Sequence, residues 1–371
     1  MYDVIIVGAG ASGVMCAIQA SNKGKRVLLI DSNTIPAKKL MVTGNGKCNM
    51  TNVNTDSSRY NTNIDKYLSR FGVKDTLSFF SKLGLVVHVD DEGRVYPFSN
   101  NARSVIDVLC AKLNKNGVTF LSGQKVIDIH KMPNKYEVLT ETDNFATKNV
   151  VLATGGVEQI GLIKRSKLYP SLCALKTKDD FKKLSGARLS DVVVKASCDG
   201  KTMTDRGEVL FKDNGLSGIV VFNISSLFAR MKKYVGVVSI DLMPDYNIAD
   251  VKKMLCDRLI DSDLNNIFVG WFSDEVTKLV VAKSKVKSIN KNSIDMLAQT
   301  IKMLKFDIVG FYDNNQVVSG GVSLNDLDNN LQSKQYSGLY VVGECCDVDG
   351  ECGGYNLQWA WTSGWIVGSA I

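Results

Sequence analysis

Two glycine-rich stretches near opposite ends of the 371-residue chain carry the residue types best suited to chemistry. The first, VIIVGAGASG, spans residues 4–13, and the second, GECCDVDGECGGYN, spans residues 343–356. The second combines three cysteines with four carboxylates, so by composition it could be a metal cluster, a redox disulfide or a calcium loop. The choice depends on the elements that position the two stretches.

The first stretch has the G-x-G-x-x-G spacing of a dinucleotide-binding turn. It follows an apolar run, opens a helical segment, and is followed by a second apolar run that ends at Asp31. In this motif Gly8 permits the tight turn, Gly10 lets the backbone approach a pyrophosphate, and Gly13 lets helix and strand pack closely. The helix N-terminus attracts phosphate, and Asp31 would accept hydrogen bonds from ribose while repelling a 2′-phosphate. The segment predicts a dinucleotide site, or a site for another adenosine cofactor such as S-adenosylmethionine.

The second stretch fits neither a calcium loop nor a zinc site. Its carboxylates lack the 12-residue ligand spacing of a calcium loop. Its cysteines form no C-x-x-C, and the whole chain has only two histidines, which also disfavours a Ser-His-Asp triad. We therefore expect no metal and interpret Cys345, Cys346 and Cys352 as space-filling side chains. A Cys346–Cys352 disulfide is disfavoured in a reducing cytoplasm.

The bulk composition is that of an ordinary globular chain of about two domains. The net charge of +7 is mild and its basic residues are dispersed, so nucleic-acid binding is disfavoured. The last 18 residues carry polar side chains and three glycines, which predicts a buried amphipathic helix and no membrane span. An apolar strand directly at the N-terminus leaves no room for a signal peptide, and the odd set of nine cysteines indicates reduced thiols, so we expect a cytoplasmic protein.

The middle of the chain changes character twice. Residues 38–52, KKLMVTGNGKCNMTN, predict a loop that could lie across a cofactor, with Lys39 and Lys47 toward phosphates and Asn49 as an amide partner. Residues 85–99 predict a hairpin, 101–117 a helix, and 125–156 a three-stranded meander leading into a buried strand. From about 171 to 318, strand-like stretches precede a helical stretch near 248–304, which predicts an inserted domain. This region has no second strand–G-x-G-x-x-G–helix unit, so NADH or NADPH would act as a transient reductant without a dedicated Rossmann domain.

Three apolar strands that end in small residues favour FAD over the other adenosine cofactors. They end at Gly8, in the A-T-G-G of residues 153–156, and in the G-E of residues 343–344. FAD is long, so three strand ends of one sheet would hold ADP, pass the pyrophosphate and place an acid on the ribitol. The last helix would direct its N-terminus at the pyrimidine edge of the flavin and stabilise the negative charge of the reduced ring. A methyltransferase that binds S-adenosylmethionine needs no third strand and helix from the C-terminus, so this cofactor is disfavoured.

Five segments together resemble the BaiN/YhiN-type family of FAD-dependent oxidoreductases, which has aminoacetone-oxidase-like and bile-acid enone-reductase-like members. They are DVIIVGAGASG, KKLMVTGNGKCNMTN, VVLATGG, SGGVSL and GLYVVGECCDVDGECGGYNLQWAWTSGWIVG. The resemblance covers the whole chain and implies an α/β fold of the glutathione-reductase-like Rossmann type. It implies an FAD domain from residues 1–170 and 319–371 and an inserted substrate domain at 171–318. The insert would be β-barrel-like at 171–245 and 305–318, with a helical lobe at 246–304.

The resemblance also implies a set of cofactor-binding residues. The ADP half would be held by Gly8, Gly10, Ala11, Ser12, Gly13 and Asp31. The middle would be lined by Lys39, Gly44, Gly46, Asn49, Ala153, Thr154 and Gly155. The ribitol and ring would be held by Gly343, Glu344, Asp347, Gly353, Gly354, Tyr355, Asn356 and Leu357. The chain departs from the family pattern at Lys47, where arginine is usual, and in a shortened stretch after A-T-G-G.

The resulting hypothesis is an FAD-dependent oxidoreductase that transfers a hydride between flavin N5 and a small organic substrate. Amine oxidation and reduction of an activated C=C bond both stay open. The candidate catalytic residues are Tyr355, Asn49 and Cys48, although a lone Cys48 lacks the partner cysteine of disulfide reductases, which favours a packed thiol. The alternative is a non-catalytic flavin-binding regulatory or partner-binding protein that uses its basic insert to dock an acidic partner such as RNA. Oligomeric state is not predicted.

Overall fold

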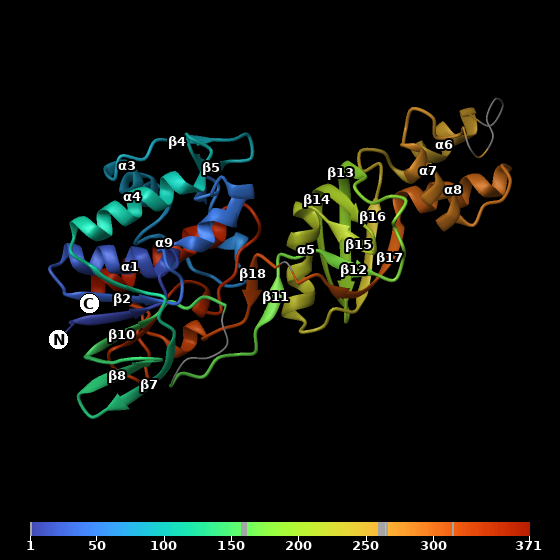
Figure 1. Cartoon of the computed structure of the whole chain (residues 1–371). Helices are drawn as coiled ribbons and strands as arrows, with labels where there is room; N and C mark the ends of the chain where they lie inside the picture. The colour runs from blue at the N-terminus through green and yellow to red at the C-terminus, as the bar shows by residue number, and fades with distance from the viewer. Residues whose placement is uncertain (1, 157–161, 259–263, 265, 314) are drawn as a thin grey trace. The chain divides into compact units, whose positions relative to one another are not determined.

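The apolar runs at the two ends of the chain form strands of one parallel sheet. The structure, a computed structural model, describes residues 2–156, 162–258, 264, 266–313 and 315–371. The chain divides into two units, Met1–Leu168 with Val317–Ile371, and Tyr169–Gln316. Each unit encloses its own hydrophobic core (Figure 1).

The sheet of the first unit has five parallel strands in the order β19-β10-β1-β2-β6. They are β1 (Val4–Val7), β2 (Val27–Asp31), β6 (Thr119–Ser122), β10 (Asn149–Leu152) and β19 (Leu339–Val341). All residues of the central strand β1 are buried, as expected for a parallel sheet that is covered on both faces, and so are those of the edge strand β19. The carboxyl ends of β1, β10 and β19 therefore lie at the same edge, where α/β folds bind their ligands.

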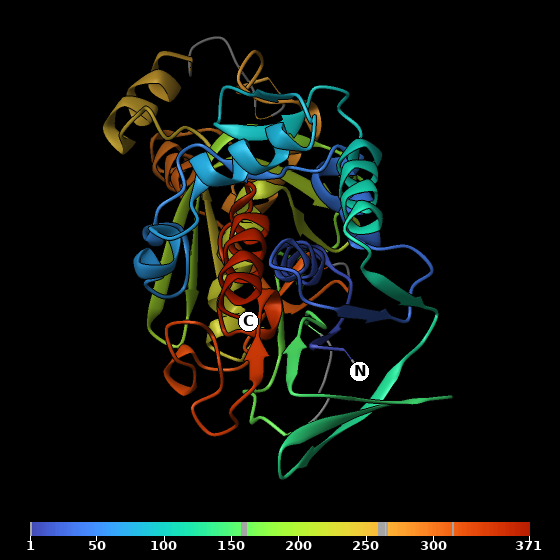
Figure 2. The ribbon, with the colours of Figure 1, turned by 90° about the vertical axis from the view of Figure 1, so that its left-hand side faces the viewer.

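Two helices from opposite ends of the sequence, α1 (Ala11–Asn22) and α9 (Tyr355–Ala370), lie against each other beside this sheet (Figure 2). Their close approach depends on two glycines of α9. A Cβ atom at Gly364 would lie 2.3 Å from the Ser12 carbonyl oxygen, and one at Gly368 would lie 2.6 Å from the Cys16 carbonyl oxygen. Only hydrogen fits at these two positions, so the backbones of α1 and α9 are in direct contact.

The rest of the first unit surrounds this centre with short elements. Its helices are α2 (Asp65–Leu68), α3 (Val73–Lys82) and α4 (Ala102–Lys115), with 3-10 turns η1 (Lys38–Gly46), η2 (Ser57–Arg59), η3 (Leu324–Asp326) and η4 (Gly343–Cys345). Two small antiparallel sheets follow the orders β3-β5-β4 and β7-β8-β9. Their strands are β3 (Thr51–Asn52), β4 (Val87–Val89), β5 (Arg94–Pro97), β7 (Val126–Met132), β8 (Lys135–Thr140) and β9 (Asn144–Thr147); strand β18 (Val317–Ser319) also belongs to this unit. The hairpin and the meander predicted from the sequence are thus both present.

The second unit contains a closed barrel of six strands in the order β12-β15-β14-β13-β16-β17. They are β12 (Leu175–Thr177), β13 (Arg188–Cys198), β14 (Lys201–Lys212), β15 (Gly215–Ser217), β16 (Gly236–Asp241) and β17 (Leu304–Phe311), preceded by β11 (Tyr169–Ser171). Three helices between β16 and β17 form the helical part: α6 (Ile248–Arg258), α7 (Asp274–Ser284) and α8 (Lys291–Lys302). Together with the parallel sheet of the first unit, these elements confirm the predicted fold class.

One helix was not predicted and two local predictions were wrong. Residues Ile219–Arg230, inside the region expected to be β-barrel-like, form helix α5, because seven residues of this segment are buried in the second unit and the packing outweighs the weak helix propensity of its β-branched residues. The predicted loop at 38–52 is largely the 3-10 segment η1, broken at Thr43, Gly44 and Asn45. Helix α9 is buried on nearly all sides rather than amphipathic, as expected for a helix whose sequence lacks a charged face.

The glycine contact between α1 and α9 predicts a stability defect in the variant Gly364→Ala. Alanine favours a helix over glycine by about 1 kcal/mol, but overpacking against a backbone oxygen costs about 1–3 kcal/mol. We expect a net loss in the free energy of unfolding, measured by urea denaturation. In Gly310→Ala the new Cβ atom would meet nothing closer than 3.8 Å, so this control should unfold like the parent. Equal stability of both variants would contradict a tight α1–α9 contact.

Candidate functional site

The turn between β1 and α1 has the shape of an anion cradle. Gly8 has a φ of +104°, and a Cβ atom there would lie 2.3 Å from the Ala153 carbonyl oxygen. A Cβ atom at Gly13 would lie 2.0 Å from the Gly8 carbonyl oxygen. In front of Gly10, by contrast, nothing in the described part of the chain comes within 4 Å of the Cβ position, and no side chain caps α1. The N–H groups of Ala11 to Gly13 precede the first intrahelical bond, which runs from the Val14 N–H to the Gly10 carbonyl, so they suit a pyrophosphate.

Asp31 braces this turn from the end of β2. Its Oδ2 accepts from the Ala9 N–H at 2.6 Å, and its Oδ1 accepts from the Asn33 backbone and side-chain N–H groups at 2.7 and 2.8 Å. A carboxylate offers about four lone-pair sites, so it retains room for one further donor. The predicted ribose contact is compatible with this geometry.

Glu344 joins three segments at the carboxyl edge of the sheet. Its Oε1 accepts from the Val318 N–H at 2.9 Å, and its Oε2 accepts from the Gly156 N–H at 3.2 Å and from Lys39 Nζ at 3.3 Å. The Cβ position of Gly155 is 3.3 Å from the same Oε2. Most acceptor sites of the Glu344 carboxylate are thus occupied by donors of the protein itself. The ion pair with Glu344 holds Lys39 near the end of β10.

The end of β19 contacts both long helices. Gly343 has a φ of +61°, and a Cβ atom there would lie 2.5 Å from Ser12 Oγ in the first turn of α1. Its N–H donates to Ser363 Oγ at 2.9 Å, and its carbonyl accepts from Trp359 Nε1 at 3.0 Å. On the neighbouring strand end, Thr154 Oγ1 lies 3.3 Å from Cys345 Sγ. The three predicted strand ends are therefore brought together around α1.

A second cluster forms at the N-terminus of α9. Gly354 has a φ of +102°, precedes the helix without a side-chain cap, and has Asn49 Oδ1 2.8 Å from its Cβ position. Asn49 is only 9% exposed, and its Oδ1 has no hydrogen-bond partner among the described residues. The first intrahelical bond runs from Gln358 N–H to the Gly354 carbonyl, so the N–H groups of residues 355–357 precede the ladder. An unmet acceptor beside unmet donors fits the pyrimidine edge of a flavin, which carries both N3–H and the N1/O2 acceptors.

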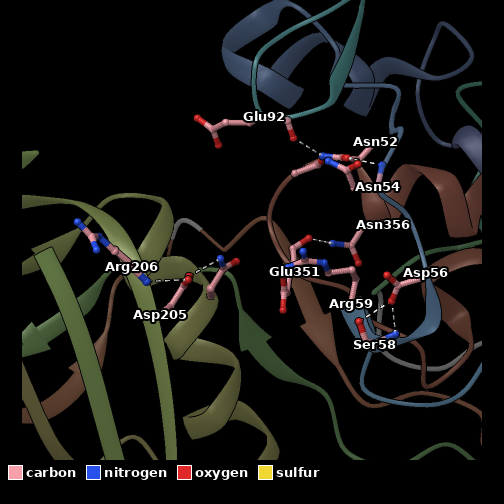
Figure 3. A network of polar contacts seen from close by, with 12 residues as sticks. Asn52, Asn54, Asp56, Ser58, Arg59, Glu92, Asp205, Arg206, Glu351 and Asn356 are labelled. Carbon is pink, nitrogen blue, oxygen red and sulfur yellow. Dashed lines mark hydrogen bonds and ion pairs between the residues drawn. The ribbon is translucent and has the colours of Figure 1, made fainter. Parts of the chain in front are cut away.

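The loop that leads into α9 is fastened by side chains from residues 52–61 (Figure 3). Asn52 Nδ2 donates to the Gly353 carbonyl at 3.1 Å, and Arg59 pairs with Glu351 at 2.9 Å. Asn356 Nδ2 donates to the Gly350 carbonyl at 2.8 Å, while its Oδ1 accepts from the Gly350 N–H at 2.9 Å. The Asn356 side chain, predicted to face the ribitol or ring, is engaged by this loop, and only its backbone N–H is directed to the helix end.

The remaining predicted residues have mixed surroundings. Gly44 is needed because a Cβ atom there would lie 2.8 Å from the Asn49 nitrogen, whereas Gly46 has no such neighbour. Asp347 is fixed through its backbone, with its N–H donating to the Val322 carbonyl at 2.8 Å. Leu357 packs at the edge of the main core.

The two candidate catalytic side chains that can ionise, Cys48 and Tyr355, both have raised pKa values. Burial raises the pKa of Cys48 to about 12, so its thiol is protonated near neutral pH. Burial also raises the pKa of Tyr355, although the Arg59 guanidinium, 5.8 Å from the ring, opposes the shift. Asn49 does not titrate. The geometry gives Cys48 a packing role and leaves Tyr355 and Asn49 next to the end of α9.

The cysteine cluster holds no disulfide, because all nine cysteines of the chain are thiols. Cys345 Sγ and Cys346 Sγ contact the carbonyls of Gly155 and Val341, both at 3.5 Å. Within the described ranges no group of three His, Cys, Asp or Glu residues could hold a metal ion. Over the same residues, none of the helices combines the length and apolar character that crossing a membrane requires.

Sequence reasoning missed the residues that organise the site from behind. They are Thr51, Asn52, Arg59, Gln358, Gly364 and Gly368. Gln358 and Thr362 stand four residues apart in an otherwise apolar helical segment, and this spacing could have indicated a buried polar pair. The contacts of Asn52 and Arg59 join positions about 300 residues apart and left no local signal.

Known proteins resemble this chain over nearly its whole length. The family described as HI0933-like protein Rossmann domain matches residues 2–370. The 3-dehydro-bile acid delta(4,6)-reductase of Clostridium scindens is 31% identical, over 100% of this chain and 99% of that protein. The ribosomal RNA dihydrouridine synthase of Escherichia coli is 27% identical, over 98% of this chain and 96% of that protein. The solved 3-ketosteroid-delta4-(5alpha)-dehydrogenase of Rhodococcus jostii is 11% identical over 100% of this chain and 96% of that chain, with a TM-score of 0.48.

Two glycines of the first turn predict opposite defects. Gly13→Ala places a Cβ atom against the Gly8 carbonyl and should lower the free energy of unfolding by about 1–3 kcal/mol. Gly10→Ala meets only open space, so the protein without cofactor should keep its stability while FAD binding weakens by about tenfold or more, or about 1.4 kcal/mol. Thermal unfolding and FAD titration measure the two effects. Unchanged FAD affinity in Gly10→Ala would contradict a pyrophosphate at this turn.

Thiol reactivity tests the packing role of Cys48. In the native protein at pH 8, iodoacetamide should modify the exposed Cys256 and leave the buried, protonated Cys48 intact, as read by peptide mass spectrometry. All nine cysteines should react after unfolding in urea. Native labelling of Cys48 at the rate of Cys256 would show instead an accessible thiolate.

Proposed function

Because this chain belongs to the HI0933-like family, we propose that it reduces a carbon–carbon double bond conjugated to a carbonyl group in a small organic substrate. Its predicted class and cofactor are confirmed at the level of the family, which is one of flavoprotein oxidoreductases that bind FAD. The alternative of a non-catalytic flavin-binding protein is therefore not retained. The observation that carries the proposal is the full-length, 31% identity to a protein named as a reductase.

Bound FAD would supply a hydride at N5, and a nicotinamide cofactor is the class of reductant that would restore it. The hydride goes to the β-carbon of the enone, a proton goes to the α-carbon, and the product is the saturated ketone. In this proposal the N–H groups at the start of α1 bind the pyrophosphate and Asp31 binds the ribose. Asn49 and the first N–H groups of α9 orient the pyrimidine edge.

The ionisable side chains beside α9 support reduction over amine oxidation. Amine oxidation needs a base that removes a proton from the substrate ammonium group. Cys48 and Tyr355 both have raised pKa values because they are buried, so they are protonated at neutral pH. We assign the transfer of the proton to Tyr355, the first residue of α9, and a packing role to Cys48.

A second candidate substrate is a uridine in RNA, since the C5=C6 bond of uracil is also conjugated to a carbonyl. The likeness to a ribosomal RNA dihydrouridine synthase favours it. The charges of the second unit argue against it, because many of its basic side chains are already paired with acids. Such pairs include Arg206 with Asp191, Lys233 with Asp199 and Lys283 with Asp179. Paired cations release fewer counterions on binding a phosphate backbone.

Anaerobic turnover separates these activities. The purified protein is reduced with NADH or NADPH, and flavin reoxidation is followed by its visible absorbance. A 3-keto-4-ene steroid, unmodified ribosomal RNA, and a primary amine with oxygen are offered in parallel. We expect reoxidation with the steroid enone and no hydrogen peroxide from the amine. Reduction of RNA alone would support the second candidate, and amine oxidation with inert enones would overturn the proposal.

The pH profile tests Tyr355 as proton donor. A raised pKa keeps the phenol protonated through neutral pH, so kcat should hold constant and fall only above the ordinary tyrosine value of about 10. Tyr355→Phe should lower kcat by about 10²–10⁴-fold and remove the alkaline limb. A variant with the parental kcat would exclude this role.

A further inference from the structure

Gln358 is a fully buried polar side chain in the first turns of α9, and each of its polar atoms has a partner. Its Oε1 accepts from Thr51 Oγ1 at 2.6 Å. Its Nε2 donates to Thr76 Oγ1 and to Thr362 Oγ1, both at 3.0 Å. One amide therefore links β3, α3 and α9 in the interior of the first unit.

The chemistry of the hydroxyl groups fixes the orientation of this amide. Thr362 Oγ1 donates its proton to the Phe71 carbonyl at 2.7 Å, so it can only accept from Gln358. The nitrogen of the amide must therefore face Thr362, and the oxygen must face Thr51. A flipped amide would place two acceptors against each other and leave a buried donor unmet.

Thr51, which Gln358 holds, contacts the residue that precedes α9. A Cβ atom at Gly354 would lie 2.6 Å from both the carbonyl carbon and the oxygen of Thr51, so segment 49–51 lies directly on the residue that precedes the helix. Asn49 Oδ1, the unmet acceptor of the site, is 2.8 Å from the same position. By holding Thr51 from within α9, Gln358 fixes Asn49 relative to the first N–H groups of that helix.

We propose that Gln358 is a positioning residue. It sets the separation between Asn49 Oδ1 and the first N–H groups of α9, and thereby tunes the preference of the protein for reduced over oxidised FAD. The inference rests on the proposed function only in that FAD occupies this site. Gln358 would act on the cofactor only through other residues, because its side chain is fully buried and its amide oxygen and both N–H groups bond within the protein. It acts through Asn49 and the helix end.

The sign of the effect follows from the charge of the cofactor. Reduced flavin carries negative charge at its pyrimidine edge, and the N-terminus of α9 offers uncapped N–H groups and the positive end of the helix dipole. If segment 49–51 is no longer held, the ring sits less closely on these groups. The reduced form then loses more binding free energy than the oxidised form, so the midpoint potential becomes more negative.

The test is the variant Gln358→Met, which keeps the length of the side chain and removes its hydrogen bonds. We expect at least a tenfold loss in the affinity for reduced FAD relative to oxidised FAD. For a two-electron couple this corresponds to a midpoint potential about 30 mV more negative. The potential is measured by dye equilibration and the affinity for oxidised FAD by titration, both without substrate.

Two further variants distinguish positioning from general destabilisation. Tyr136→Phe removes a hydrogen bond of another buried side chain of the same unit, from the Tyr136 hydroxyl to the Ser337 carbonyl, and should lower stability without moving the potential. Gln358→Met with Thr51→Val removes both partners of the Thr51–Gln358 hydrogen bond, so the double variant should regain stability over Gln358→Met while the potential stays shifted.

A parental potential in Gln358→Met, or a shift of equal size in Tyr136→Phe, would overturn the inference. Failure of the parent protein to bind FAD would instead contradict the proposed function. A parent that binds FAD but reduces no enone leaves this test valid, because its readouts do not involve substrate.

Discussion

The site depends on the backbone contact between α1 and α9. Gly364 and Gly368 let the last helix of the chain rest on the carbonyls of Ser12 and Cys16, at distances that no side chain would allow. This contact joins the two ends of the sequence and fixes the N-termini of two helices relative to each other. Because an N-terminus presents unmet N–H groups and partial positive charge, the pair offers two anion-favouring points at a constant separation.

The surrounding residues either leave space for a ligand or hold the backbone around that space. Gly10 leaves space at the N-terminus of α1, no side chain caps α9, and Asn49 supplies a buried acceptor without a partner among the described residues. Glu344 binds neighbouring segments with its carboxylate, and the Asn356 side chain fastens the loop before α9. An extended cofactor with an anionic centre and an amide-like edge is the ligand that meets these features with the fewest unpaired groups.

Burial of the side chains near the N-terminus of α9 determines their protonation state. Cys48 and Tyr355 are shielded from water, and their pKa values are raised, so the end of α9 is surrounded by groups that hold protons near neutral pH. Such surroundings suit a reaction in which the substrate gains a hydride and a proton. The enone of a steroid and the uracil ring present the same conjugated bond to this chemistry, so the choice between them depends on what the rest of the protein binds.

The fold class and the first turn could be predicted because their signals are local. The spacing of Gly8, Gly10 and Gly13 and the apolar runs that form β1, β2 and β19 can be recognised in short stretches of the sequence. Helix α5 was missed because burial decided its structure against propensity, and the anchors Thr51 and Gln358 were missed because their bond spans 307 positions. Glu344 and Asn356 were predicted from their place in the motif, and the partners of the Glu344 carboxylate arise only when distant segments meet.

A structure of the protein with FAD bound tests the central claim most directly. The account predicts the pyrophosphate at the first turn of α1, Asn49 Oδ1 within hydrogen-bond distance of flavin N3, and the N1/O2 edge facing the N–H groups of residues 355–357. A flavin ring directed away from α9, with Asn49 making no contact to it, would contradict the account.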